Sequence, residues 1–503
     1  MKSKIIGLII LLAIWVTTFF GIDFLIDYLT NDVSPFYVSV FVRFSAGLIV
    51  ASIWISVLFR SENTANKMPW LLLLIVAPIF GSMLFLSFAR DYKKSKRYKK
   101  KKLIHHEKYL LYEARSYLNG ISENVNDVFK YTASVTNHSI YANNSSSKIL
   151  IDGDDFYGSY FEKISKAKEY IFIAFYIIRS DSIGRYLIDL LIKKAEEGVE
   201  VKIIYDYLGS QDLKRKDLKK LRSHGIRIYP IDKIIVPIFN TKINYRYHRK
   251  ITIIDGEYAF TGGFNVGNEY LLGTKKYRWR DTHLLIEGGI VKSLTAVFAR
   301  DWYYVTDELI SDEKYYKKSY VENSGYYQVL QSGPDTVPII RNTYLKMIYS
   351  AKKYIYISTP YLGLDKETET ALKVAAKSGV DIRILIPGVP DKKTVYKVTE
   401  SFIESLLEEG VKIYKFNNTF NHSKFIVVDD YLASCGTYNL DVRSSIINFE
   451  NTILMSSKSV QELRDCFLTD LENSSVVSYN EWRRRSKFDK LITAVLNLFT
   501  PLA

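Results

Sequence analysis

The sequence reads His248-Arg-Lys-Ile-Thr-Ile-Ile-Asp255 near its middle, and His422-Ser-Lys-Phe-Ile-Val-Val-Asp429 repeats this pattern. After each aspartate, six residues precede a glycine, and an asparagine stands three positions beyond it: Gly262 and Asn265, then Gly436 and Asn439. The chain has only seven histidines, and two of them open these copies. Because chance seldom repeats such a pattern at the same offsets, it predicts one site built from two halves of the chain.

Both copies are rich in β-branched residues and end at turn residues, which predicts that each copy is a β-strand. Strand side chains alternate between two faces, so each histidine shares a face with the lysine two positions later, Lys250 or Lys424. Asp255 and Asp429 fall on the opposite face. On that face we expect both aspartates to have a structural role, in which each pairs with a backbone amide or a cation.

The predicted pocket is rich in hydrogen-bond donors and positive charge. Gly262-Gly263 predicts a tight turn with a close backbone approach, after which Asn265 and Asn439 return donors toward the site. Two histidines, two lysines and two asparagines suit a phosphate or a phosphodiester. Imidazole is a competent nucleophile that titrates near neutral pH, so one ring can attack phosphorus while the other protonates the leaving oxygen.

Two plainer interpretations compete with this one. A lone histidine on a strand is usually a packed or surface residue, and the duplication argues against that. A metal site needs clustered His, Cys or carboxylate ligands, whereas each copy offers one histidine with its aspartate on the other face. We therefore expect no metal.

The motifs resemble those of the phospholipase D superfamily and, more closely, those of bacterial cardiolipin synthases. The resemblance covers roughly residues 60 to 500. The fragments that carry it are Asn244-Tyr-Arg-Tyr-His-Arg-Lys250, Gly262-Gly-Phe-Asn-Val-Gly267, Trp279-Arg-Asp-Thr-His283, Gln331-Ser-Gly-Pro-Asp335 and Asn448-Phe-Glu450.

This resemblance implies a phosphohistidine intermediate, with neither metal nor cofactor. It implies that His248 attacks and that His422 acts as general acid and then as base. It further implies that both His-Lys-Asp sets are catalytic, that Asn265 and Asn439 bind substrate, and that an acidic residue after each histidine orients the imidazoles. Those acidic residues are Asp281, after His248, and Glu450, after His422. The plainer alternative for either carboxylate is a surface salt bridge.

The chain has 503 residues and a formal net charge of +15. Three apolar stretches open it, at about 5–29, 36–59 and 69–89, and each approaches the length of a membrane span. Residues 90–102 follow with nine cations and one anion. A basic cluster beside a membrane anchor favours anionic lipid headgroups and a cytoplasmic position. We therefore predict two or three transmembrane segments in an uncleaved anchor, with the catalytic domains cytoplasmic.

The remaining composition excludes other classes. The two cysteines, Cys435 and Cys466, form no CxxC pair, so the sequence indicates reduced thiols rather than a zinc knuckle or a disulfide framework. Beside a membrane anchor, nucleic acid is disfavoured as a partner. An oligomer stays open, because nothing in the sequence decides it.

A second repetition predicts the fold class. Lys168-Glu-Tyr-Ile-Phe-Ile-Ala-Phe-Tyr176 resembles Lys353-Tyr-Ile-Tyr-Ile-Ser-Thr-Pro-Tyr361, and predicted helices at 183–197 and 366–378 follow them. This predicts an α/β protein of two pseudo-symmetric halves, each a mixed sheet flanked by helices, with the site at their seam. The predicted domains are a membrane anchor (1–90), a basic juxtamembrane linker (91–145), the first half (146–320), the second half (321–481) and a C-terminal amphipathic helix (482–503).

That terminal helix has apolar residues at 488, 491, 492, 495, 498, 499 and 502, which makes one helical face. The spacing fits a helix packed on the core and equally a helix lying on a membrane.

Taken together, the resemblance implies a membrane-bound phosphatidyltransferase that converts two phosphatidylglycerol molecules to cardiolipin and glycerol. The alternatives are a phospholipase D-type hydrolase or a transferase using another alcohol. A basic membrane scaffold with a degenerate site is a third hypothesis, disfavoured by the intact His and Lys of both copies.

Overall fold

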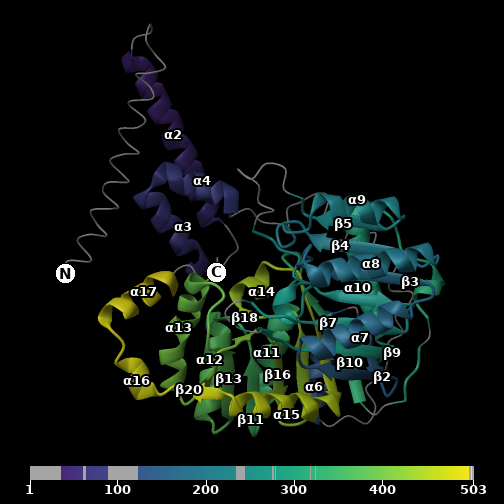
Figure 1. Ribbon diagram of the computed structural model, residues 1–503. Coiled ribbons are helices and arrows are strands. Elements are labelled where there is room, and N and C mark those ends of the chain that lie inside the picture. Colours follow the sequence, from purple (N-terminus) through teal and green to yellow (C-terminus); the bar gives the residue numbers. More distant parts are fainter. Residues whose placement is uncertain are drawn as a thin grey trace. The chain divides into compact units, whose positions relative to one another are not determined.

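The computed structural model describes residues 35–59, 64–88, 123–136, 138–233, 244–274, 277, 279–317, 319–322, 325–497 and 500 (Figure 1). The chain divides into two compact units. One comprises residues 1–91 with 234–244, and the other comprises residues 92–233 with 245–503. Both sequence repeats lie in the second unit.

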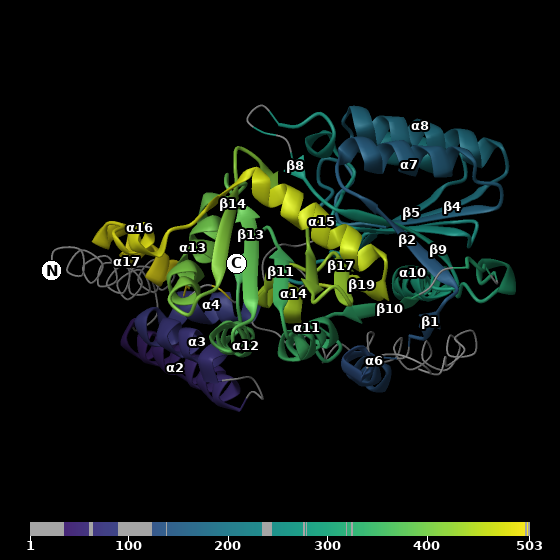
Figure 2. The same cartoon turned by 90° about the horizontal axis from the view of Figure 1, so that it is seen from below.

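The first repeat forms a mixed sheet flanked by helices. Its strands are β2 (Ser145–Leu150), β3 (Tyr170–Phe175), β4 (Glu200–Asp206), β5 (Arg227–Ile231), β6 (Ile251–Ile254), β7 (Tyr258–Gly262) and β9 (His283–Gly288). Its helices are α7 (Gly153–Ser165), α8 (Ser182–Glu196), α9 (Arg215–Ser223) and α10 (Val291–Thr306). The sheet order is β2-β9-β7-β6-β3-β4-β5, with β3, β4 and β5 parallel and the remaining neighbours antiparallel. Helices α7 and α8 cover one face and α10 the other (Figure 2).

The second repeat has the same order of strands. They are β10 (Gly325–Ser332), β11 (Tyr354–Ser358), β13 (Asp381–Pro387), β14 (Lys412–Phe416), β16 (Phe425–Val428), β17 (Leu432–Gly436), β19 (Glu450–Ser457) and β20 (Ser474–Val476). The helices are α11 (Ile339–Ser350), α12 (Lys366–Lys377), α13 (Lys393–Leu407), α14 (Val442–Ile446) and α15 (Ser459–Glu472). The order β10-β19-β17-β16-β11-β13-β14 matches that of the first sheet strand for strand. The predicted α/β class with two pseudo-symmetric halves is thereby confirmed.

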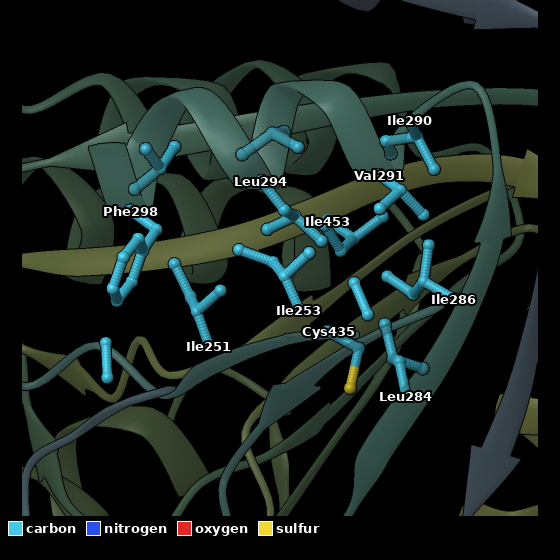
Figure 3. Close-up of a cluster of buried hydrophobic side chains, with 14 of the residues drawn as sticks. Ile251, Ile253, Leu284, Ile286, Ile290, Val291, Leu294, Phe298, Cys435 and Ile453 are labelled. Carbon is cyan, nitrogen blue, oxygen red and sulfur yellow. The ribbon is translucent and has the colours of Figure 1, made fainter. Parts of the chain in front are cut away.

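One hydrophobic core joins the two halves. Ile251, Ile253, Leu284 and Ile286 from the first sheet pack with Leu294 and Phe298 of α10, and Cys435 and Ile453 from the second sheet belong to the same cluster (Figure 3). Helix α15 adds Val460, Leu463 and Phe467 from the other side. Because these side chains are buried only when the halves are docked, hydrophobic burial fixes how the two halves meet.

Part of the predicted linker is not a linker. Residues 123–142 form α6 (Glu123–Val135) and β1 (Ile140–Ala142). Strand β1 pairs antiparallel with β10, and Val128 and Phe129 of α6 are buried in the core of the second half. The apolar face of this short helix was missed because the basic run before it dominates the composition.

The first unit contains α2 (Pro35–Leu58), α3 (Thr64–Val76) and α4 (Pro78–Phe88). The predicted span at 69–89 is divided between α3 and α4, because Pro78 has no N–H to donate and its ring opposes a continuous helix. Within the residues that the structure describes, no helix combines the length and apolar character needed to cross a bilayer. The apolar stretch at 5–29 and the basic run at 90–102 lie outside the described residues.

The predicted C-terminal helix is broken. Trp482 belongs to α16 (Tyr479–Arg483), and α17 (Lys487–Asn497) starts after it. Ser486 caps α17, since its hydroxyl accepts a hydrogen bond from the backbone N–H of Asp489 at 3.1 Å. Helix α17 is held against α13 by ion pairs such as Lys397–Asp489 at 2.6 Å, and within it Phe488 stays largely exposed.

Candidate active site

Both motif histidines lie at the seam between the halves. Each stands just before its strand, β6 or β16, so the strands are shorter than the sequence predicted. The reason is a change of hydrogen-bond partner. The backbone N–H of His248 donates to the carbonyl oxygen of Phe449 at 3.0 Å, and the backbone N–H of His422 donates to the carbonyl oxygen of Arg280 at 2.6 Å. In each case the acceptor belongs to the opposite half.

A short parallel ladder reinforces this connection. Strand β8 (Trp279–Arg280) of the first half pairs with β15 (Phe420–Asn421) of the second. A single bridge between Tyr247 and Phe449 is its counterpart on the other side. Backbone pairing therefore connects the two halves at two places, one on each side of the site.

Each imidazole is held by an acid from the opposite half. His248 Nδ1 lies 2.9 Å from Glu450 Oε2, and His422 Nδ1 lies 2.5 Å from Asp281 Oδ2. The order of residues along the chain places Asp281 after His248 and Glu450 after His422, and the structure crosses these pairs. Both carboxylates are fully buried, so each is a strong and fixed acceptor for an imidazole N–H.

The two carboxylates are accommodated differently. Thr437 donates its hydroxyl to Glu450 Oε2 at 2.5 Å, and Asn448 Nδ2 lies 3.3 Å from Oε1. Gly263 occupies the position that corresponds to Thr437. A Cβ atom there would lie 1.8 Å from Asp281 Oδ1. The close backbone approach expected at Gly262-Gly263 thus makes room for the carboxylate of Asp281.

These hydrogen bonds fix the tautomer of both rings. A neutral imidazole that donates Nδ1–H to a carboxylate keeps its lone pair on Nε2. In the part of the chain that the structure describes, neither Nε2 has a hydrogen-bond partner. Both rings therefore hold an unshared lone pair ready for a substrate.

Burial keeps the imidazoles neutral. Desolvation lowers the pKa of His248 to about 4, although the charge of Glu450 opposes the shift. Burial also lowers the pKa of His422, and the charges of Lys424 and Lys250 lower it further. The pKa of Asp281 is raised to about 6 by its burial. Burial is the largest single influence on Glu450 and raises its pKa, but the interactions with His248, Lys250 and Thr437 together outweigh burial and lower this pKa overall.

The two motif lysines are buried beside the rings. Lys250 Nζ donates to the carbonyl oxygen of His248 at 2.8 Å, and Lys424 Nζ donates to that of His422. Desolvation lowers the pKa of Lys250 to about 7 and that of Lys424 to about 8. A bound phosphate would supply negative charge next to these amines and restore their protonated form.

The motif aspartates lie outside this cluster. Asp255 accepts hydrogen bonds from the backbone N–H groups of residues 168, 169 and 170 at 2.8–2.9 Å, and Asp429 does the same at residues 352–354. Both adopt a left-handed backbone, with φ of 53° and 50°. Their carboxylates anchor the starts of β3 and β11, which corrects their inclusion in the catalytic set and fits the structural role expected from the strand alternation.

The two motif asparagines differ. Asn265 Nδ2 donates to the hydroxyl of Tyr270 at 2.6 Å, and its Oδ1 accepts from the N–H of Ile177 at 3.2 Å. Both polar atoms of the Asn265 side chain are therefore already hydrogen-bonded to other residues of the protein. Asn439 is also buried, but its Oδ1 has no partner among the described residues. Of the two, Asn439 is better placed to bind a substrate.

Buried ion pairs that the motifs did not reveal hold the site together. Arg249 donates to Asp301 of α10 at 2.6 Å, and Arg280 donates to Asp470 of α15 at 3.1 Å. The second pair crosses from the first half to the second. Arg249 lies within the motif and Arg280 next to Asp281, but their partners lie on distant helices that no spacing in the sequence marks.

No group of three His, Cys, Asp or Glu side chains suited to a metal ion occurs among the described residues. The cluster itself offers two lone pairs on nitrogen, two amines and two carboxylates. Such a cluster can form and break a bond to phosphorus at one ring while the other ring gives a proton to a substrate oxygen or takes one from it.

The family described as "Cardiolipin synthase, PLD-like domain" matches residues 160–302 and 344–471. This chain belongs to that family. The matched segments contain both histidines and both acids of the cluster. The family's own repeat thus coincides with the two halves seen in the fold.

Relatives and solved structures agree. The chain is 37% identical over 466 residues to "Cardiolipin synthase" of Alkalihalophilus pseudofirmus, covering 90% of this chain and 92% of that protein. It is 37% identical over 471 residues to "Cardiolipin synthase" of Geobacillus kaustophilus, covering 91% and 93%. The crystal structure of phosphatidylserine synthase from Haemophilus influenzae Rd KW20 aligns with a TM-score of 0.59 at 15% identity, covering 76% of this chain and 100% of that one. This last likeness shows the shared fold.

Proposed function

We propose that this protein is a cardiolipin synthase that joins two phosphatidylglycerol molecules into cardiolipin and releases glycerol. It is a phosphatidyltransferase of the phospholipase D superfamily. The observation that carries the proposal is the crossed pair of imidazoles, each held by a buried carboxylate of the opposite half and each with an unshared Nε2.

The reaction proceeds by two displacements at one phosphorus atom. In the first, His422 takes up a proton at Nε2 once the anionic phosphodiester is bound. His248 Nε2 then bonds to the phosphorus of a lipid, the bond to the glycerol oxygen breaks, and His422 gives that oxygen its Nε2 proton. In the second, His422 takes the proton from a headgroup hydroxyl of another phosphatidylglycerol. That oxygen then bonds to phosphorus and His248 leaves. The assignment of His248 as nucleophile follows the resemblance to the superfamily.

The other groups support the charge that develops. Lys250 and Lys424 lie on the same faces as the rings and would neutralise the non-bridging oxygens. Glu450 and Asp281 stabilise whichever ring becomes an imidazolium. Asn439 would hydrogen-bond the headgroup. The burial of both rings restricts water, which would otherwise produce phosphatidic acid.

We further propose that the enzyme works at a membrane through its N-terminal unit, with the catalytic halves on the cytoplasmic side. Many large apolar side chains are exposed in α2, α3, α4 and at Phe59, which follows α2: Phe44, Leu48, Ile49, Ile55, Leu58, Phe59, Met68, Leu72, Ile75, Phe80 and Met83. An apolar surface of this kind is unfavourable in water and suits lipid. Sedimentation with phosphatidylglycerol vesicles after a carbonate wash, compared with protein lacking residues 1–90, tests this attachment.

The catalytic proposal is tested with labelled phosphatidylglycerol in vesicles. Wild-type protein should release cardiolipin and glycerol in equal amounts. His248→Ala should be inactive, and His422→Ala should be inactive in turnover while retaining labelled phosphoprotein. His224→Ala is the matched control, because His224 lies on the surface at the end of α9. Release of phosphatidic acid alone would show a hydrolase instead, and full activity of His248→Ala would overturn the assignment.

A further inference from the structure

Helix α17 contacts the rest of the second half through its polar side. It lies beside α13 at the edge of that half (Figures 1 and 2). Asp489 pairs with Lys397 of α13 at 2.6 Å. One residue further on, Lys490 pairs with Glu404 of α13 at 3.3 Å. The buried residue of α17 is Thr493, which is also polar. At 3.6 residues per turn, these three side chains lie within about 100° of one another around the helix axis.

The apolar side of α17 faces away from the protein. Phe488 is 68% exposed, Leu491 38% and Val495 46%. Their spacing of three and four residues puts them on one face of the helix, here called the apolar stripe. At the edge of the stripe, Leu496 packs partly buried against the core of the second half. A helix that serves only to cover a core buries its apolar face, so the two faces of α17 are reversed.

Basic residues at the start of α17 and just before it have no acidic partner. Arg483, Arg484 and Lys487 are exposed, and no carboxylate pairs with them in the part of the chain that the structure describes. Residues 479–497 contain five cations and two acids, and Asp489, one of the acids, is already neutralised by ion pairs. An excess of exposed positive charge therefore lies next to the apolar stripe.

Helix α17 ends near the active site. Thr500, three residues beyond it, is buried, and its Cγ2 lies 3.6 Å from the position that a Cβ would take at Gly363. Gly363 belongs to β12 (Leu362–Gly363), which pairs with β18 (Leu440–Asp441). Asn439, to which we assign the lipid headgroup, directly precedes β18. A surface that contacts α17 therefore lies close to the site that its lipids have to reach.

We propose that α17 lies on the surface of an anionic membrane, with the apolar stripe among the acyl chains and the three unpaired cations at the headgroups. Helices with an exposed apolar face and basic flanking residues bind in the plane of a membrane interface. Basic residues are further attracted to the anionic lipids of the cytoplasmic leaflet. The inference rests on the proposed function, because phosphatidylglycerol is then both the anionic lipid of the surface and the substrate.

This contact belongs to the catalytic halves and is separate from the N-terminal unit. Attachment through the N-terminal unit keeps the enzyme at the bilayer but does not orient the halves. A second contact at α17 turns the side that carries β12 and β18 toward the headgroups. Its loss should therefore slow the reaction most when phosphatidylglycerol is scarce in the surface.

The contact is tested with a nitroxide spin label on full-length Val495→Cys protein in vesicles of phosphatidylglycerol and phosphatidylcholine. The native Cys435 and Cys466 are buried and should stay unlabelled. Dissolved oxygen concentrates in lipid, whereas a nickel complex stays in water. At residue 495 the label should be reached more readily by oxygen than by the nickel complex.

Tyr349→Cys gives the matched control label. Tyr349 is also an exposed apolar residue of the second half, at 61%. It lies at the end of α11, which leads into the start of β11, whereas β12 follows the other end of that strand. The label at residue 349 should be reached more readily by the nickel complex.

Two changes at Phe488 test what the contact does. Phe488→Glu should withdraw the label at residue 495 from lipid and slow cardiolipin formation at limiting phosphatidylglycerol by about tenfold, as expected for one aromatic side chain lost from lipid. Phe488→Trp should keep both the contact and the rate. The thermal midpoint should stay that of wild type in both variants, because Phe488 is largely exposed.

The charge is tested separately. Arg483→Gln should lower the ratio of membrane-bound to free α17 by about fivefold, since each basic residue near an anionic surface contributes this much. High salt should have the same effect on the wild-type protein.

A label at residue 495 that the nickel complex reaches as readily as it reaches residue 349 would overturn the proposal. A label that neither oxygen nor the nickel complex reaches would overturn it too, because the stripe would then lie against protein. Dilution of the protein in the vesicles would release the label if that protein were a second copy, and would not if it were the N-terminal unit. Failure of the proposed function looks different, because the label would enter lipid while wild-type protein made no cardiolipin.

Discussion

The crossed acids give the sharpest prediction, and Glu450→Gln is the variant that tests it. The change keeps the shape of the side chain and removes its charge. Glu450 is fully buried and accepts hydrogen bonds from His248, Thr437 and Asn448. An amide has only one accepting oxygen, so its NH₂ group must face at least one of these donors.

The size of the effect follows from the kind of bond lost. A hydrogen bond to a charged group contributes about 1.5–3 kcal/mol, and removing it leaves the imidazolium of His248 without that support. At about 1.4 kcal/mol per factor of ten, the rate should fall by roughly 10- to 150-fold. The amide NH₂ that opposes a buried donor should also lower the free energy of unfolding by about 1–3 kcal/mol.

The pH dependence of the rate tests in which direction the His248 pKa moves in Glu450→Gln. The charge of Glu450 raises the pKa of His248, although burial brings the net value down to about 4. Removing the charge must lower this pKa further. A nucleophilic His248 works only when neutral, so the acid limb of the rate profile should move to lower pH in Glu450→Gln. If His248 had to be protonated, the alkaline limb would move to lower pH instead.

The assay is cardiolipin formation from labelled phosphatidylglycerol between about pH 3 and 9, so that the acid limb near the His248 pKa is covered, alongside thermal unfolding. Glu462→Gln, a neutralised surface acid on α15, is the control and should behave as wild type. A Glu450→Gln enzyme with the wild-type rate and profile would refute the assignment of Glu450 to His248. So would a shift of the His422 ring resonances in place of those of His248 when histidine titrations are followed by NMR.

Three further predictions follow from the packing around the site. Gly263→Ala should reduce activity about 100-fold and lower the free energy of unfolding by about 1–3 kcal/mol, because its Cβ must displace the buried Asp281 carboxylate. Asp301→Asn should lower the free energy of unfolding by about 3–5 kcal/mol in urea titrations, because it leaves Arg249 buried without its counter-charge. Asp255→Ala should lower the thermal midpoint, at about 1–3 kcal/mol for each backbone amide left unsatisfied.

Each of these variants has a counterpart elsewhere in the chain. Gly158→Ala meets no atom within 4 Å and should be neutral or stabilising. Asp465→Asn and Asp189→Ala remove surface ion pairs worth about 0–1 kcal/mol. If the buried variants differed no more from wild type than these do, the roles given to Gly263, Asp301 and Asp255 would be wrong.

The sequence predicted the parts of the fold that local patterns encode. The expected helices at 183–197 and 366–378 correspond to α8 and α12 within one residue at each end. The strand alternation also foretold that Asp255 and Asp429 face away from the rings. These predictions depend only on periodicity within a few residues, which can be read directly from the sequence.

What the sequence could not state was which side chains meet across the seam. Asp281 follows His248 in the chain and yet holds His422, because docking of the halves decides the partner. The backbone at residues 246–249 leaves its own sheet for the same reason.

The crossing of the acids also means that neither half contains both a motif histidine and the acid that orients it. A chain interrupted after the first half would contain His248 without Glu450, the acid that orients it. An isolated second half would contain His422 without Asp281. An incompletely synthesised protein therefore lacks the pair of oriented imidazoles on which the chemistry depends.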